Sequence, residues 1–218
     1  TTDRTQIVPM LTRHINMSVA EVTEQYADLL VRTTDGLFGE HLRPMRQSIR
    51  TLNKSKRELK NLRRRETLCL RRAEPPVAGI RLSTNFHLIH NSLRQMLYGL
   101  IRIAEPAYEH VDNHFSPIDA TFAARYTKLR TEFTELIAEI AGNFRNQRSE
   151  DNDALMARCS EIRSELHNLG QEIGVAIQTT DVNLTAITLM LHLVQETEQL
   201  LVEVKELLKN TKLYREMV

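Results

Sequence analysis

Apolar side chains recur every three or four positions along most of the chain, which is the spacing of one buried helix face. The clearest example is the stretch 85–115, which carries an apolar stripe and then the polar run Glu109–His114. The stripe consists of Phe86, Ile89, Leu93, Met96, Leu100 and Ile103. Pro106 lies between the two parts, and a proline inside a helical pattern usually kinks the helix or begins a new one.

Five further stretches show the same periodicity, so the sequence predicts six long helices. We expect them over 18–35, 40–73, 85–115, 122–144, 155–176 and 182–212, after a lead-in segment over 1–16. Ser18 and Glu21 form a capping box at the first helix, and Gly36 stands where a helix end requires a positive φ. The predicted fold is all-α: six antiparallel helices in one compact domain, divided into three-helix halves over 17–115 and 116–218.

The composition agrees with a helical protein. The chain has 218 residues, 41% of them hydrophobic, with seven Gly and no Trp. Cys69 and Cys159 match no disulfide framework or zinc motif, which fits a reducing compartment. No apolar run approaches the ~20 residues that span a bilayer, so we expect a soluble fragment. The chain begins at Thr1 and not at Met, and we expect it to be a piece of a longer protein.

Charge is distributed unevenly, although the net charge is only +1. Residues 54–72 hold nine Lys/Arg against two Glu, whereas residues 130–206 hold fourteen acids against six bases. This asymmetry predicts a charge dipole. The basic run consists of Lys54, Lys56, Arg57, Lys60, Arg63, Arg64, Arg65, Arg71 and Arg72.

Three interpretations of the basic run remain open. It is a solvated helix face paired with the acidic later helices, a contact for an anionic membrane or acidic partner, or a phosphate contact for nucleic acid. Nucleic acid is not expected as a partner, because no aromatic side chains are interleaved and no recognition motif is present.

Candidate metal chemistry is concentrated in the polar run at 109–114. Its metal-capable side chains are Glu109, His110, Asp112, Asn113 and His114. On a helix, His110 and His114 would lie one turn apart and could chelate one ion, and imidazole favours Zn, Ni or Fe. A transition metal is therefore the candidate cofactor. The alternative is a polar helix end in solvent, with histidine near the negative end of the helix dipole.

A second histidine pair, His87 and His90, lies within the apolar stripe. It is ~30 Å from His110 along a continuous helix, so the two groups cannot share an ion unless the chain folds back at Pro106. We interpret His87 and His90 as hydrogen-bonded neighbours of the core. The sequence contains no glycine-rich phosphate loop, nucleophile elbow or HExxH motif, and we expect a protein that is not an enzyme.

The run SLRQMLYGLIRIAEPAYEHVDNHFSPI, residues 92–118, resembles the soluble C-terminal tail of Pit-type inorganic phosphate transporters of Bacteroidetes. Residues 191–209 resemble the last helix of that tail, and the six-helix layout is similar to PhoU-like phosphate-transport regulators. The resemblance covers most of 40–212. PhoU proteins carry Glu/Asp-x-x-x-Asp clusters that bind metal, and the nearest match here is Glu109-x-x-x-Asn113, with an amide in place of a carboxylate.

The resemblance implies a regulatory or interaction domain of a phosphate transport system, tethered at the cytoplasmic face of the inner membrane. Its partners would be the membrane domain of a phosphate permease or a second copy of itself, with the basic run near anionic lipids. The alternatives are a stand-alone PhoU-like regulator or helical adaptor, and a metal-dependent helical-bundle enzyme. A start codon just before Thr1 would favour the stand-alone protein, and an upstream reading frame with apolar segments would favour the tail.

Overall fold

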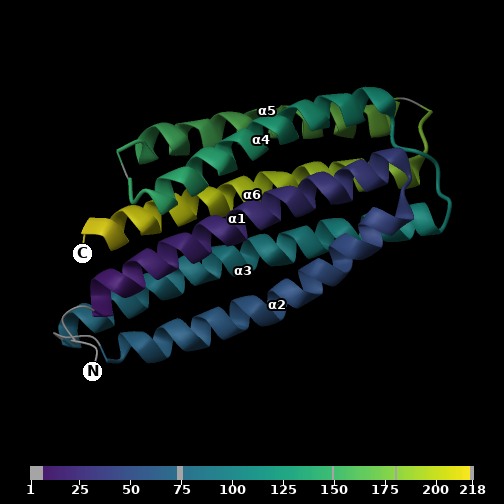
Figure 1. Ribbon diagram of the computed structural model, residues 1–218. Coiled ribbons are helices and arrows are strands. Elements are labelled where there is room, and N and C mark those ends of the chain that lie inside the picture. Colours follow the sequence, from purple (N-terminus) through teal and green to yellow (C-terminus); the bar gives the residue numbers. More distant parts are fainter. Residues whose placement is uncertain (1–6, 73–75, 149, 180, 217–218) are drawn as a thin grey trace.

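The computed structural model describes residues 7–72, 76–148, 150–179 and 181–216, and these residues contain six α-helices and no β-strand (Figure 1). The predicted all-α class is confirmed. The helices are α1 (Ile7–Gly39), α2 (Leu42–Leu70), α3 (Pro76–Asp112), α4 (Ala120–Arg145), α5 (Asn152–Thr179) and α6 (Leu184–Glu216).

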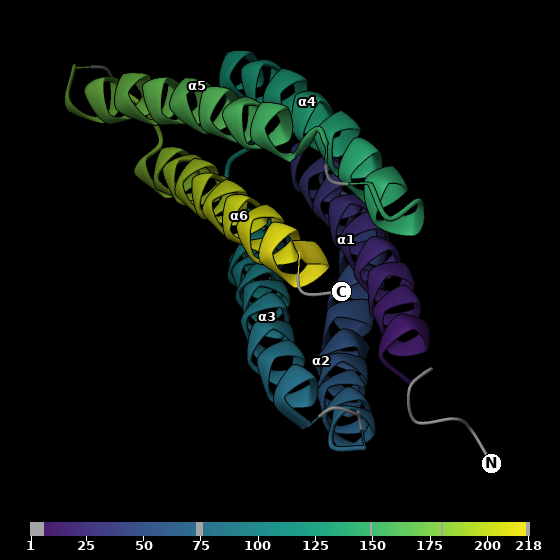
Figure 2. The ribbon, with the colours of Figure 1, turned by 90° about the vertical axis from the view of Figure 1, so that its left-hand side faces the viewer.

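Successive helices run antiparallel and stack in three tiers. Figure 2 shows α4 and α5 in one outer tier, α1 and α6 in the middle, and α2 and α3 in the other outer tier. Within the first half, α1, α2 and α3 all pack on one another, and in the second half α5 packs on both α4 and α6. The two halves are joined because α1 also packs on α4 and α3 on α6.

The predicted apolar stripes form the core of this stack. All six stripe residues predicted between 86 and 103 are buried, and the buried apolar residues of all six helices form one continuous cluster. Burial of an apolar side chain stabilises the fold by about 1.5–3 kcal/mol, so this shared cluster is the main force that holds six rods together.

The first helix begins earlier than predicted. Residues 7–16 belong to α1 and not to a lead-in segment, and residues 1–6 of that segment lie outside the described residues. Leu11 and Ile15 continue the stripe of Val19 at four-residue steps, but Thr12 and Asn16 are also buried and obscure the pattern. The capping box predicted at Ser18 is therefore wrong, because that residue lies inside the helix.

Three helices end in the same turn, a Schellman motif in which one residue adopts the left-handed conformation. That residue is Glu40 after α1 (φ 56°), His114 after α3 (φ 55°) and Gln147 after α4 (φ 53°). At α1 the amide of His41 donates to the carbonyl of Gly36 at 2.9 Å. Each end thus satisfies carbonyls that would otherwise lack a donor.

Gly36 has a different role from the predicted positive-φ cap. No described glycine has a positive φ. A Cβ at position 36 would lie 2.4 Å from Cγ of the buried Met45, so glycine is needed for the close approach of α2 to α1. Pro106 does not begin a new helix, because α3 continues through it as far as Asp112.

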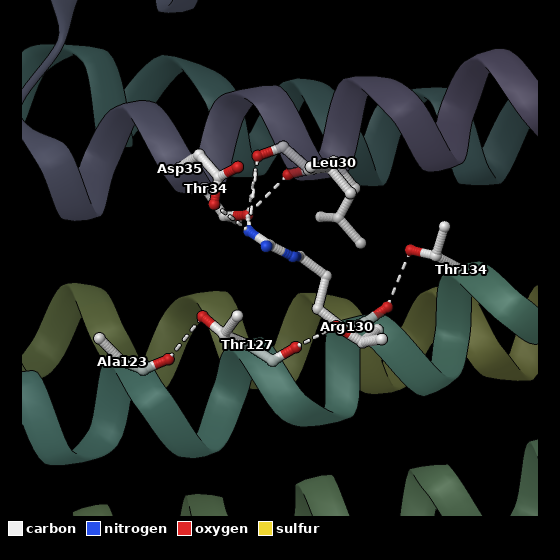
Figure 3. A network of polar contacts seen from close by, with 9 residues as sticks. Leu30, Thr34, Asp35, Ala123, Thr127, Arg130 and Thr134 are labelled. Carbon is white, nitrogen blue, oxygen red and sulfur yellow. Dashed lines mark hydrogen bonds and ion pairs between the residues drawn. The ribbon is translucent and has the colours of Figure 1, made fainter.

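The two halves also meet through buried polar contacts made by α4. Tyr126 is fully buried, its hydroxyl lies 2.9 Å from that of Thr197 on α6, and its ring packs edge-on against Phe38 of α1. One turn further along, the guanidinium of Arg130 donates to Thr34 Oγ1 at 2.8 Å and to Asp35 Oδ1 at 2.7 Å, both on α1 (Figure 3). Because these donors and acceptors need specific partners, they set the register of α4 against α1 and α6.

We expect the Tyr126→Phe variant to lower the free energy of unfolding by about 1 kcal/mol, because it removes the hydrogen bond to Thr197. Tyr26→Phe is the matched control. The hydroxyl of Tyr26 is also buried, but it has no hydrogen-bond partner in the described part of the chain. Its removal should leave stability unchanged or raise it. Urea denaturation measures both variants, and an equal loss in the two would contradict this account.

Candidate functional site

The polar run at the end of α3 does not assemble the predicted metal ligands. Glu109, Asp112, Asn113 and His114 are exposed, whereas His110 is buried. Nε2 of His110 lies 2.6 Å from the main-chain carbonyl of Ser116, so it must carry a hydrogen and donate it. The ring also packs against Phe115 with centroids 5.5 Å apart. His110 therefore closes the turn that follows α3.

The geometric premise of the chelating pair is wrong. α3 ends at Asp112, and His114 occupies the left-handed position of the turn, so it is not one helical turn from His110. The amide of Phe115 donates to the carbonyl of His110 at 3.1 Å, which completes the Schellman motif. Across the described residues, no three His, Cys, Asp or Glu side chains are grouped as metal ligands.

His90 has the structural role that its position in the stripe predicted. It is buried, and its Nε2 lies 3.0 Å from the carbonyl of Leu59, which joins α3 to α2. Burial lowers the pKa of His90, with smaller contributions in the same direction from Arg63 and Arg94, while the bond to Leu59 opposes them. His87 is exposed.

Seven residues of the basic run lie on α2, and Arg71 and Arg72 follow its end; all nine side chains are exposed. Lys54 pairs with Glu58 at 3.6 Å, Arg65 with Glu66 at 3.5 Å, and Lys56 stands over the ring of Tyr98. Among the described residues no ion pair links the basic run to α4, α5 or α6. The first predicted alternative, a solvated helix face paired with the acidic later helices, thus holds for the exposure of the face, and its pairing is not seen among the described residues.

The basic helix α2 and a cluster of glutamates lie in opposite outer tiers of the bundle. α2 carries ten Lys/Arg against two Glu and lies in one outer tier (Figure 2). The opposite tier has a groove of about 230 Å³ between α4 and α5, lined by Glu132, Glu135, Glu161 and Glu165 beside Arg158. The predicted charge dipole stays a prediction, because α4 and α5 together carry seven Asp/Glu and six Lys/Arg and are nearly neutral as a tier.

A histidine–carboxylate pair that the sequence did not indicate lies between α5 and α6. Nδ1 of His167 is 3.2 Å from Oε1 of Glu198, and both face a depression of about 340 Å³ with Ser160 and Ser164. Nε2 of His167 is 3.2 Å from the amide of Gln171, so both ring nitrogens are engaged. No pattern within one helix could reveal this pair, because its members are 31 residues apart.

In comparisons with known proteins, no family model, no curated protein and no solved structure matches the chain. Each described helix also lacks the length of apolar sequence needed to cross a bilayer. The exposed basic face of α2 is therefore the feature from which a function is best argued.

We expect His114→Gly to raise the free energy of unfolding by up to about 1 kcal/mol, because glycine adopts the left-handed conformation without the penalty of a Cβ. His114→Ala keeps the Cβ and should give no gain. Thermal and urea unfolding of both variants test this. A loss of stability in His114→Gly would show that the imidazole itself makes a stabilising contact.

The two thiols should differ sharply in reactivity. Cys69 is exposed, whereas Cys159 is buried in the core and its burial raises its pKa to about 12. Since the thiolate is the reactive form, an aromatic disulfide reagent at neutral pH should label Cys69 quickly and Cys159 only on unfolding. Two rapidly reacting thiols in the folded protein would contradict the packing of α5 against α6.

Proposed function

We propose that this bundle is a non-catalytic regulatory or interaction domain of an inorganic phosphate transport system, the soluble tail of a phosphate permease. It would act at the cytoplasmic face of the inner membrane. The observation that carries the proposal is the exposed basic face of α2, which lies on the outside of the bundle without acidic partners from the later helices.

The number and placement of the bases support an anionic surface as the contact. Each Lys or Arg near an anionic bilayer contributes about 1 kcal/mol, so three or four bases give about millimolar attraction, and eight or nine together would reach about micromolar. Only two of them form ion pairs among the described residues, and both of those pairs are with Glu58 and Glu66 of the same helix. Most of the basic charge is thus free to meet an external anion.

The opposite face gives the domain a second contact. With α2 toward the lipid, α4 and α5, which line the glutamate-rich groove, lie in the tier farthest from the membrane. It is open to a basic surface of the permease or of a second copy. The phosphate-transport context itself rests on the resemblance of residues 92–118 and 191–209 to Pit-type tails.

The buried polar groups support a non-catalytic role. Four buried side chains each make a hydrogen bond between helices or at a helix end: Tyr126, Arg130, His90 and His110. Burial also raises the pKa of Tyr126, which keeps its hydroxyl neutral as a hydrogen-bonding group. Such groups fix the bundle and leave its outer surface for binding.

Co-sedimentation with lipid vesicles tests the proposal. The protein should bind vesicles that contain phosphatidylglycerol and ignore pure phosphatidylcholine. Binding should be lost between 0.1 M and 1 M salt, because the Debye length falls from about 10 Å to about 3 Å. Vesicle binding that depends on neither lipid charge nor salt would overturn the proposal.

Matched charge reversals locate the contact. Lys60→Glu with Arg64→Glu should weaken vesicle binding at least about tenfold, since two contributions of ~1 kcal/mol each are lost. Lys128→Glu with Arg148→Glu changes the net charge equally, but these exposed residues lie at α4 and its following turn. The control pair should bind nearly as well as the unchanged protein. Equal losses would mean that only net charge matters.

A further inference from the structure

One end of the first three helices combines exposed apolar side chains with arginine. The start of α1, the end of α2 and the start of α3 lie together at the left of Figure 1, because the three helices alternate in direction. Figure 2 shows this end toward the viewer, in its lower half. The contact of His14 on α1 with Glu66 on α2, at 3.1 Å, fixes the register of the two helices here.

Each of the three helices exposes a large apolar side chain at this end. Met10 on α1 is 54% exposed, Leu68 on α2 is 52% exposed and Ile80 on α3 is 67% exposed. Single exposed apolar side chains are ordinary on a protein surface. Three exposed apolar side chains from different helices at one end give that end a surface suited to contact with an apolar medium.

The same end is strongly basic. Its exposed arginines are Arg13, Arg63, Arg64, Arg71, Arg72 and Arg81. Residues 7–20, 59–72 and 80–104 contain one acid, Glu66, which is 1% exposed at its side chain and is held by His14 and Arg65. No carboxylate of these segments therefore meets the solvent, and none would repel an anionic surface.

The opposite end of the molecule offers an internal comparison. Phe115, Val175 and Leu184 are exposed there as well. Their charged neighbours along the chain, however, are the acids Asp112, Asp119, Glu172 and Asp181. Two of these acids have arginine neighbours, Glu172 with Arg125 and Asp112 with Arg46, so this end is mixed in charge. The segments of the basic end expose arginines and no acid, so an anionic bilayer would select between the two ends by charge.

We propose that the basic end of the first three helices is a membrane-insertion surface for an anionic lipid bilayer. Met10, Leu68 and Ile80 enter the boundary between headgroups and acyl chains, as the apolar face of an interfacial helix does. The surrounding guanidinium groups bind lipid phosphates with paired hydrogen bonds. This inference rests on the proposed function and deepens it, because it replaces a purely electrostatic contact by one with an inserted apolar edge and a defined orientation.

Site-specific fluorescence tests the insertion, because the chain has no Trp and each introduced Trp reports one position. Leu68→Trp and Ile80→Trp place the probe at the proposed end, and Val175→Trp and Leu184→Trp place it at the other end. All four positions are exposed, so the substitutions should not disturb the core. Circular dichroism and urea unfolding confirm that each variant is folded.

The vesicles contain phosphatidylglycerol and phosphatidylcholine with brominated acyl chains, which quench Trp only at insertion depth. The emission of Trp at 68 and 80 should shift to shorter wavelength and be quenched, and the emission of Trp at 175 and 184 should stay unchanged. In the Trp-free protein, Leu68→Ser with Ile80→Ser should weaken binding about tenfold or more for the lost apolar burial.

The outcomes separate this inference from the proposed function. Salt-sensitive vesicle binding without quenching at 68 or 80, or with equal quenching at both ends, overturns the insertion and leaves the electrostatic contact in place. Quenching at 175 and 184 alone overturns the orientation. Absence of vesicle binding by the unchanged protein overturns the proposed function and the insertion together.

Discussion

The packing of α1 on α4 and of α3 on α6 is the constraint on which the rest of the molecule depends. Without these two contacts the chain would be two sets of three helices, each with an apolar face in water. With them, the buried side chains of all six helices form one cluster. Tyr126 and Arg130 lie at this junction and bind partners on α6 and α1. These hydrogen bonds fix the register of helices that apolar burial brings together.

The same constraint sorts the charges. α1 and α3 each pack against three other helices, whereas α2 packs against two and keeps a free outer face for its long basic side chains. α2 lies in one outer tier and is strongly basic, and the glutamate-lined groove of α4 and α5 lies in the other (Figure 2). The basic face and these glutamates do not pair, because the tier of α1 and α6 lies between them.

Much of the polar chemistry that stands out in the sequence serves helix ends and helix contacts. His110 binds the Ser116 carbonyl in the turn after α3, and His90 binds the Leu59 carbonyl on α2. His114 holds a left-handed position that glycine usually occupies. A helix leaves its last four carbonyls without internal donors. A cluster of titratable residues at the end of a long helix is therefore first to be interpreted as the residues that terminate it.

The sequence by itself determined the helices and their buried faces, because apolar side chains with a 3.6-residue period lie on one face of an α-helix. It also determined that α2 would be basic and that His90 would belong to the core. Tertiary structure decided the rest. It placed Thr12 and Asn16 inside and so began α1 at Ile7, and it used Gly36 for the approach of Met45. It also bound His110 to the carbonyl of Ser116 and brought His167 to Glu198. Such contacts depend on which segments meet, and no period along one helix records that.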